Sequence, residues 1–283
     1  MTVDYYRKFF VITEVDRKLP LILETVGYEH KQQPTRREEG YPCFHWLQTT
    51  LGSGDIVTDS GTFKLGEQQG ILMPAGIPHA YKAAGGGPWS TWYLTFDGAL
   101  AASIVHSLEL PLMTTVSWGS DAPLAGIHES FYEQYRYSYD FTGMNGSLEV
   151  YRFLTLLKQH GYVNRAASFS QSHERLLPLL FRLEESFAQP DVGLGWMSDI
   201  LGVSPQHVNN LFRKAFGISP YQYLLQLRLQ KSKEMLIARP AYTVKQVAEE
   251  TGFLDASHFI STFRKSAGMT PEMFRNQYKN KDS

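Results

Sequence analysis

The sequence is poor in the features that mark membrane, secreted or thiolate-metal proteins. It has a single cysteine, Cys43, so no disulfide can form within the chain and no group of thiolates can bind a metal. No apolar run is long enough to cross a bilayer, and the sequence shows no secretory signal peptide. We therefore expect a cytoplasmic protein that has no membrane partner.

The chain has 283 residues, a length that favours two domains. Its net charge is also close to zero, at −1. The charge is unevenly distributed, however. Residues 1–170 hold 13 Lys and Arg against 17 Asp and Glu, whereas residues 171–283 hold 14 against 11. Because phosphate groups attract positive charge, contact with nucleic acid is expected in the C-terminal part. The excess of +3 is small, so we expect two binding units or a dimer to share this contact.

One segment of the C-terminal part occurs twice. Phe212-Arg213-Lys214 recurs 51 residues later as Phe263-Arg264-Lys265, and a glycine and a Ser/Thr-Pro pair follow each copy. Both copies have the pattern of a helix, a glycine turn, a capping residue and a second helix that ends at glycine. This pattern predicts helix-turn-helix motifs at about 194–217 and 244–268, joined by a helix over 221–238.

The outward faces of the second helices carry candidate DNA contacts. Amide side chains can pair with adenine in the major groove, and arginine and lysine bind phosphates. A tandem helical hairpin without a ligand is the alternative, but the matching Arg-Lys pairs favour DNA binding. The candidates in the first copy are Gln206, Asn209, Asn210, Arg213 and Lys214, and those in the second are Ala256, Ser257, Ile260, Ser261, Arg264 and Lys265. Because the second set has fewer hydrogen-bonding groups, we expect the first copy to read more bases.

A longer motif extends through the second copy. It consists of Gly252-Phe253, Asp255, Ser257, Phe259, Phe263-Arg264-Lys265, Gly268, Thr270-Pro271 and Phe274-Arg275. This motif closely resembles the AraC/XylS family of transcription regulators, and the resemblance covers about the last hundred residues. It implies a DNA-binding regulator, most often an activator, with base contacts at the positions named above. It also implies double-stranded DNA, RNA polymerase and a second copy of the chain as partners.

Residues 1 to about 120 favour strands. Short segments rich in β-branched and aromatic residues lie at 19–25, 43–50, 61–65 and 89–96, between turns rich in glycine and proline, which is typical of a sandwich or small barrel. The segments 52–54 and 71–81 resemble a cupin barrel. Apolar residues at helical spacing predict two further helices, one from Pro123 to Tyr139 and one that Ser147 caps after an Asn145-Gly146 break. These helices either pack on the sheet or form a dimer interface.

The expected fold class is therefore α+β with two domains. Residues 1–160 form a cupin-like β-barrel with two helices at its C-terminal end. Residues 161–172 form a polar linker, and residues 173–283 form an all-α domain with both helix-turn-helix motifs.

A metal centre of the cupin type would need several imidazoles and a carboxylate that converge on one ion. Only His79 matches the second cupin motif, and the sequence around His45 reads Phe-His-Trp. We expect His79 to form a structural hydrogen bond, and we expect no metal, no cofactor and no catalytic residue. The alternative is a cupin isomerase or dioxygenase fused to a DNA-binding domain.

The same strand-rich segment resembles the ligand-binding domain of AraC-type sugar regulators. The resemblance implies that Arg37, Tyr81, Thr91 and Tyr93 bind a small-molecule effector. Thr91 and Tyr93 depart from the residues that bind arabinose in that family, so a different carbohydrate is expected. Aromatic faces cover the C–H patches of a sugar while arginine and tyrosine donate to its hydroxyls. Core packing of the two tyrosines, a surface position for Arg37, and a barrel that is structural or recruits a partner protein are the alternatives.

Overall fold

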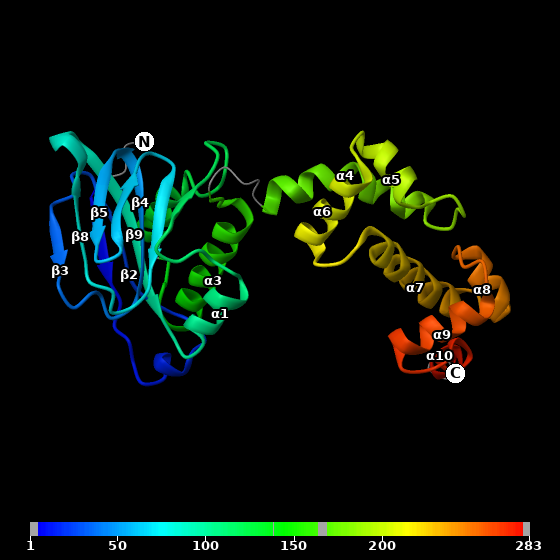
Figure 1. Cartoon of the computed structure of the whole chain (residues 1–283). Helices are drawn as coiled ribbons and strands as arrows, with labels where there is room; N and C mark the ends of the chain where they lie inside the picture. Colours follow the sequence, from blue (N-terminus) through cyan, green and yellow to red (C-terminus); the bar gives the residue numbers. More distant parts are fainter. Residues whose placement is uncertain (1–4, 138, 164–168, 280–283) are drawn as a thin grey trace. The chain divides into compact units, whose positions relative to one another are not determined.

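The computed structural model describes residues 5–137, 139–163 and 169–279 and divides into two compact units, Met1–Ser170 and Gln171–Ser283 (Figure 1). The first unit is rich in strands, and the described part of the second is helical. The expected α+β class with two domains is therefore confirmed. In the described residues, no helix has both the length and the apolar character needed to span a bilayer.

Two antiparallel sheets face each other in the first unit. The larger has the strand order β1-β2-β9-β4-β7-β10, and the smaller has the order β3-β8-β5-β6. The strands of the larger sheet are β1 (Tyr6–Phe9), β2 (Ile22–Glu29), β4 (Phe44–Gly52), β7 (Gln69–Met73), β9 (Trp89–Asp97) and β10 (Thr115–Ser117). Those of the smaller sheet are β3 (Thr35–Arg37), β5 (Gly54–Thr58), β6 (Gly61–Leu65) and β8 (His79–Ala83). A core that includes Leu47, Ile56, Met73 and Trp89 fills the space between the sheets.

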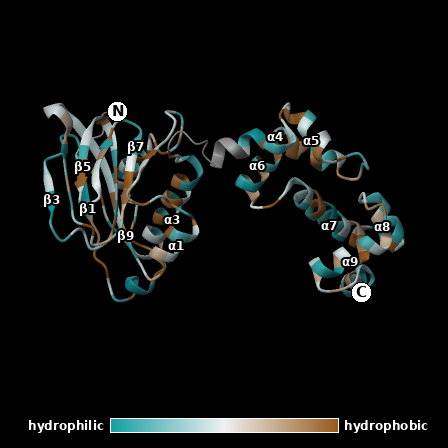
Figure 2. Cartoon of the chain, viewed as in Figure 1, coloured by the Kyte–Doolittle hydropathy of each residue, from teal (hydrophilic) through white to brown (hydrophobic). Residues whose placement is uncertain are grey.

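Three helices lie on the first unit: α1 (Ala101–Ser107), α2 (Ile127–Arg136) and α3 (Gly143–His160). These helices cover one face of the larger sheet (Figures 1 and 2). On that face Trp92 contacts Phe131 and Phe153 in one buried cluster. Alternate residues of a strand point to opposite faces, so Trp92 and Leu94 of β9 pack on the helices while Tyr93 faces the smaller sheet. The two predicted helices therefore pack on the sheet.

The predicted break at Asn145-Gly146 is wrong, because α3 begins earlier, at Gly143. Asp140 accepts hydrogen bonds from the backbone N–H and the hydroxyl of Thr142, the residue before this helix. A Cβ atom at position 146 would lie 2.1 Å from the Phe141 carbonyl oxygen. Gly146 is therefore needed for close packing inside the helix, and it does not end the helix.

The second unit contains seven helices in its described part: α4 (Phe169–Ser186), α5 (Leu194–Leu201), α6 (Pro205–Phe216), α7 (Pro220–Ala238), α8 (Val244–Glu250), α9 (Ala256–Ala267) and α10 (Pro271–Lys279). They pack around two separate cores, one built by α4 to α7 and one by α7 to α10. We call these the first and second subdomains. Helix α7 contributes residues to both cores.

The turn chemistry expected of the repeats is confirmed. Gly202 and Gly252 adopt φ of 61° and 81° in the turns, and Gly217 and Gly268 adopt φ of 70° and 73° at the ends of α6 and α9. Ser204 accepts from the backbone N–H of His207 at 3.3 Å, and Asp255 accepts from that of His258 at 2.6 Å. Both motifs are therefore helix-turn-helix units.

Both ends of the predicted linker, 161–172, belong to regular structure. The backbone of Tyr162 exchanges two hydrogen bonds with Ser117 of β10, and α4 already begins at Phe169. Residues 164–168 lie outside the described residues.

Candidate nucleic-acid interface and ligand cavity

Helix α6 has one buried and one exposed face. Val208 and Phe212 are fully buried in the core of the first subdomain, which leaves Gln206, Asn210 and Arg213 on the solvent side. Asn209 is half-buried at the edge of this face. The amides already form surface hydrogen bonds, from Gln206 Nε2 to Asn210 Oδ1 at 3.3 Å and from Asn209 Nδ2 to the Pro205 carbonyl at 3.1 Å. Because these bonds lie at the surface, the edge of a base can replace them.

Helix α9 repeats the arrangement with different side chains. Phe259 and Phe263 are fully buried, and Ser257, Ile260 and Ser261 are exposed. Ala256 is half-buried at the start of the helix. Exposure of an isoleucine side chain to water is unfavourable, and a partner that covers the side chain removes this cost. The methyl group of thymine is such a partner in the major groove.

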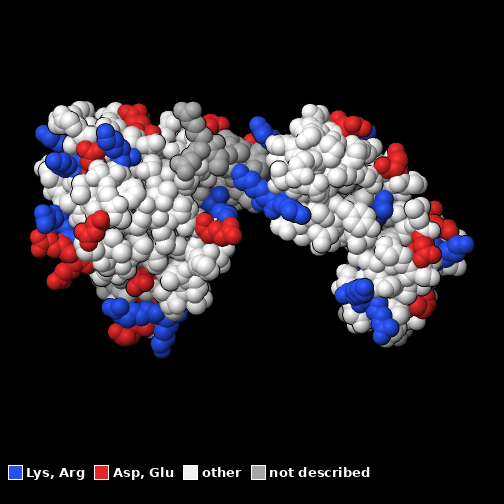
Figure 3. Space-filling view, in the orientation of Figure 1, with Lys and Arg blue, Asp and Glu red and all other residues white. Residues whose placement is uncertain are grey.

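Basic side chains occupy the last turn of each of these two helices. Arg213, Lys214, Arg264 and Lys265 are all exposed, and Arg213, Arg264 and Lys265 form no ion pair with a carboxylate among the described residues. In the view of Figure 3, the Lys and Arg side chains of the second unit lie in separate small groups. Such an arrangement suits individual phosphate contacts at several points.

A cavity of about 270 Å³ lies in the first unit, where the larger sheet faces the smaller one. Three of the four predicted effector residues, Arg37, Tyr81 and Tyr93, line it. The fourth, Thr91, does not: it is fully buried, and its hydroxyl donates to Gln32 Oε1 at 2.6 Å. Thr91 therefore holds a cavity-lining residue in place and lies behind the wall. The other lining residues are Arg7, Phe9, Thr25, Glu29, Gln32, Thr35, Tyr41, His45 and Thr95.

The Arg37 guanidinium is held by two neighbours. Its Nη1 lies 3.1 Å from His45 Nδ1, and its carbon lies 4.4 Å from the centre of the Tyr41 ring. Complete burial lowers the pKa of His45 well below its usual value, and the charge of Arg37 lowers it further. His45 is therefore a neutral acceptor at physiological pH, and Arg37 keeps most of its donors for a ligand.

Arg7 and Glu24 fix the other polar walls. Arg7 is paired with Glu29, and its guanidinium carbon lies 5.9 Å from the Tyr93 ring centre. Glu24 Oε2 accepts from the hydroxyls of Tyr41 and Thr95 at 2.6 Å each. Burial, together with this carboxylate, raises the pKa of Tyr41 to about 12. The walls therefore present arginine donors, hydroxyl oxygens and aromatic faces.

A glycine makes room for one of the aromatic walls. Gly27 of β2 is paired in register with Tyr93 of β9. A Cβ at Gly27 would lie 2.4 Å from the Tyr93 hydroxyl oxygen. The absence of a side chain at position 27 thus allows the Tyr93 ring to lie across the neighbouring strand.

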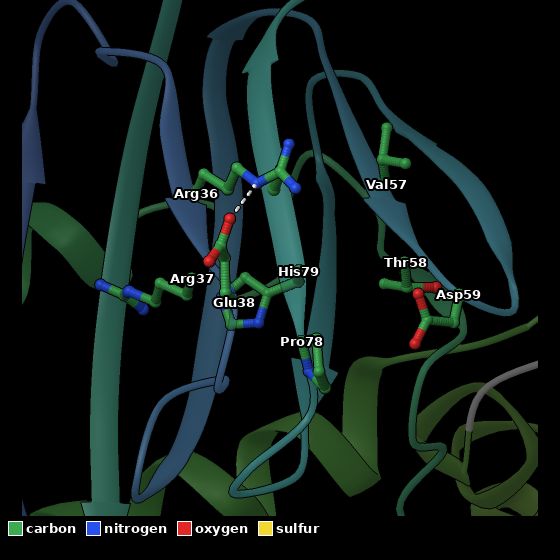
Figure 4. A pocket seen from close by; sticks show the side chains of 9 residues that line it. Arg36, Arg37, Glu38, Val57, Thr58, Asp59, Pro78 and His79 are labelled. Atoms are coloured by element: carbon green, nitrogen blue, oxygen red, sulfur yellow. Dashed lines mark ion pairs between the residues drawn. The ribbon is translucent and has the colours of Figure 1, made fainter.

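A second hollow, of about 390 Å³, lies across β3, β8 and β5 of the smaller sheet (Figure 4). Arg36 and Glu38 form an ion pair there at 3.2 Å, and the side chain of Arg37 extends the opposite way in this view. Among the described residues that line this hollow, His79 supplies the only aromatic ring. The first cavity is the better candidate for an effector, because its tyrosines and polar groups converge on one space.

His45 and His79 lie near each other, and one ring nitrogen of each is held by a neighbouring group. Their rings lie 5.8 Å apart, but His45 Nδ1 is bonded to Arg37, and His79 Nδ1 lies 2.7 Å from the Ile77 carbonyl oxygen. Among the described residues, no group of three or more His, Cys, Asp or Glu is placed to hold a metal ion.

The residues of the cavity that sequence reasoning missed come mainly from β1, β2 and β4. Arg7, Glu29 and His45 lie on strands whose alternate residues face the cavity. The alternation of residues along β4 could have predicted that His45 faces the cavity. The same reasoning could not have found Arg7, because β1 is a four-residue strand without an apolar alternation.

Comparison with known proteins agrees with this architecture. A model of a helix-turn-helix domain matches residues 197–277, and a model of the AraC-like ligand binding domain matches residues 22–143. The Msm operon regulatory protein of Streptococcus mutans is 22% identical over 244 residues, which are 81% of this chain and 82% of that protein. The uncharacterized HTH-type transcriptional regulator YobQ of Bacillus subtilis is 26% identical over 230 residues, 80% and 83% of the two chains. The HTH-type transcriptional activator RhaR of Escherichia coli is 28% identical over 131 residues, 46% of each chain.

The second unit is thus an AraC-type DNA-binding domain, and the first is a ligand-binding domain of the same type; together they define a transcription regulator. The chain belongs to the AraC family of transcription regulators. The expectation of a regulator in place of an enzyme is confirmed by the relatives, which are named as regulators.

Proposed function

We propose that the protein is a cytoplasmic transcription activator that responds to a small carbohydrate and binds its operator as a dimer, with RNA polymerase as a further partner. The observation that carries this proposal is the pairing of a polar, aromatic-walled cavity in one domain with two exposed recognition helices in the other. That RhaR is named an activator supports the same direction of regulation here.

A carbohydrate fits the groups that line the cavity. Tyr81 and Tyr93 offer aromatic faces for C–H patches, while Arg37 and Gln32 offer donors for hydroxyl oxygens. The cavity volume of about 270 Å³ lies just below the usual range for ligand sites, roughly 300–1,000 Å³. A monosaccharide is therefore favoured over a larger oligosaccharide.

The dimer is supported by the solvent side of α3. Met144, Leu148 and Tyr151 are 69%, 64% and 47% exposed and follow one another at helical spacing, so they form one apolar stripe. Sedimentation of the full chain, with and without effector, tests whether it is a dimer.

The effector proposal is tested by a thermal-shift screen of monosaccharides and their derivatives on the full chain. A ligand that binds only the folded state raises the melting temperature, and the rise grows with its concentration. A hit must then change operator affinity, footprint or transcription. If sugars bind and none of these responses changes, the cavity does not regulate. If no sugar binds, a structural barrel or one that recruits a partner protein is favoured.

The asymmetry of the two reading faces gives a prediction for DNA. Replacement of Asn210 by alanine removes an amide that can pair with adenine, so specific affinity should fall by about 1–3 kcal/mol. Ser261→Ala, the matched change on α9, should cost less. The dissociation constants of both variants are measured by anisotropy titration with an operator selected from random DNA. An unchanged operator affinity for Asn210→Ala would remove this residue from the reading face.

A further inference from the structure

The two subdomains of the DNA-binding unit share helix α7. Leu224 and Leu227 belong to the core of the first subdomain, and Leu229 and Leu236 belong to the core of the second. The partly buried Leu225 also packs against the second core, so residues of the two cores alternate between positions 224 and 229. A contact that joins the two subdomains along this stretch of α7 therefore bears directly on the angle between them.

Arg228 lies between Leu227 of the first core and Leu229 of the second. Its Nε donates to the Phe187 carbonyl at 2.8 Å, and its Nη2 donates to the Gln189 carbonyl at 3.1 Å. Both carbonyls belong to the segment that leaves the C-terminal end of α4, where backbone oxygens lack helical partners and carry partial negative charge. The guanidinium fork can satisfy two such oxygens at once, which a single ammonium group cannot do in the same geometry.

The second subdomain reaches the same point through Gly252, the turn residue of its helix-turn-helix motif. A Cβ at position 252 would lie 2.8 Å from Arg228 Nε and 2.9 Å from the Phe187 carbonyl oxygen. The turn that precedes α9 therefore packs directly on the hydrogen-bonded pair. One turn along α7, Lys231 adds an ion pair with Glu184 of α4 at 2.8 Å.

We propose that Arg228 is the positioning residue that fixes α6 relative to α9. It thereby sets the spacing between the two DNA half-sites, by which we mean the base pairs contacted by α6 and those contacted by α9 of the same chain. The inference rests on the proposed binding of both recognition helices to one DNA site. Two linked binding elements gain affinity only when their geometry matches the spacing of their sites. If the connection between the two helices is rigid, this gain in affinity falls steeply when the half-site spacing departs from its best value. If the connection is loosened, the gain falls gradually.

The test uses the full chain and a set of DNA duplexes. An operator selected by the wild-type protein is rebuilt with one or two base pairs added or removed between its half-sites, and each dissociation constant is measured by anisotropy. For the wild type, a changed spacing should weaken binding by about tenfold or more. For Arg228→Ala, the loss should shrink to about threefold or less, while affinity for a single half-site is kept.

Arg239→Ala is the matched control, because Arg239 is an exposed cation at the end of α7 whose Nη1 donates to Tyr242 in the same subdomain. It should keep the spacing profile of the wild type. Arg228→Lys retains the charge without the fork and should broaden the profile; circular dichroism identifies any variant that fails to fold. If Arg228→Ala does not fold, Arg228→Lys decides the question. A wild-type profile in a folded Arg228 variant overturns the inference, whereas a wild type without any spacing preference overturns the proposed two-helix binding.

Discussion

The buried His45 gives a prediction about pH that the structure makes quantitative. Burial and the neighbouring Arg37 lower the pKa of His45 in the folded protein, whereas an unfolded histidine titrates near pH 6.5. Below that pH the unfolded chain binds a proton that the folded chain does not. The contribution of His45 to stability must therefore decrease as pH falls below about 6.5, and it stays constant above that pH. Between pH 7.5 and 5.5 this single group should remove roughly 1 kcal/mol from the free energy of unfolding.

The measurement is urea unfolding of the full chain followed by tryptophan fluorescence at several pH values. Four of the five tryptophans, Trp46, Trp89, Trp92 and Trp118, lie in the ligand-binding domain, so the signal reports mainly on it. His79 and His128, whose pKa values are also lowered by burial, add losses of the same sign. The contribution of His45 is therefore obtained by subtraction: the change in the free energy of unfolding with pH is measured for the wild type and for His45→Gln, and the difference between the two is assigned to His45.

His106→Gln is the matched control, since it removes an exposed imidazole of α1 in the same domain. Because the comparison concerns only the change with pH, a constant loss of stability caused by either substitution cancels. Parallel stability curves for the wild type and His45→Gln between pH 7.5 and 5.5 would refute the assignment of His45 as a neutral, buried acceptor for Arg37.

Two further predictions concern the cavity and the phosphate contacts. Gly27→Ala should displace the Tyr93 ring, because the new Cβ would lie 2.4 Å from its hydroxyl oxygen, and should abolish the thermal shift caused by an effector. Gly66→Ala is its control, since the nearest atom there is 3.5 Å away; equal shifts in both variants would exclude Tyr93 from the site. Replacing Arg213 or Arg264 by alanine should weaken binding to all DNA sequences and reduce the slope of log affinity against log salt by about 0.9 for each phosphate that the variant no longer neutralises. Asn210→Ala should keep the full slope, and an unchanged slope in both arginine variants would contradict their role.

The helical domain could be predicted in detail from sequence because its signals are local. Ser204-Pro205 and Gly217 each determine a helix boundary through capping or a positive φ, and neither depends on distant residues. The helix break predicted at Asn145-Gly146 was wrong because the outcome there depends on distant residues. The pair looks like a turn in isolation, but close packing at Gly146 makes the helix continue.

The cavity could be predicted only in part, because it is assembled from strands far apart in the chain. Arg37, Tyr81 and Tyr93 were found through resemblance to a family of known fold. The pairing of Arg7 with Glu29, and the position of Thr91 behind Gln32, depend on strand register, which side-chain identity does not determine. Arg228 was missed for a similar reason: its partners are backbone carbonyls 39 and 41 residues away, which leave no trace in side-chain patterns.

The larger sheet of the first domain has a consequence for how such a regulator can change its effector over time. In β9, Tyr93 and Thr95 face the cavity, while Trp92, Leu94 and Phe96 pack against the helices. Substitutions at every second position can therefore alter chemical preference without disturbing the apolar layer that keeps the domain folded. The two kinds of selection, for recognition and for folding, act on different residues of the same strand. A different ligand preference is thus reachable by single substitutions that leave this apolar layer unchanged.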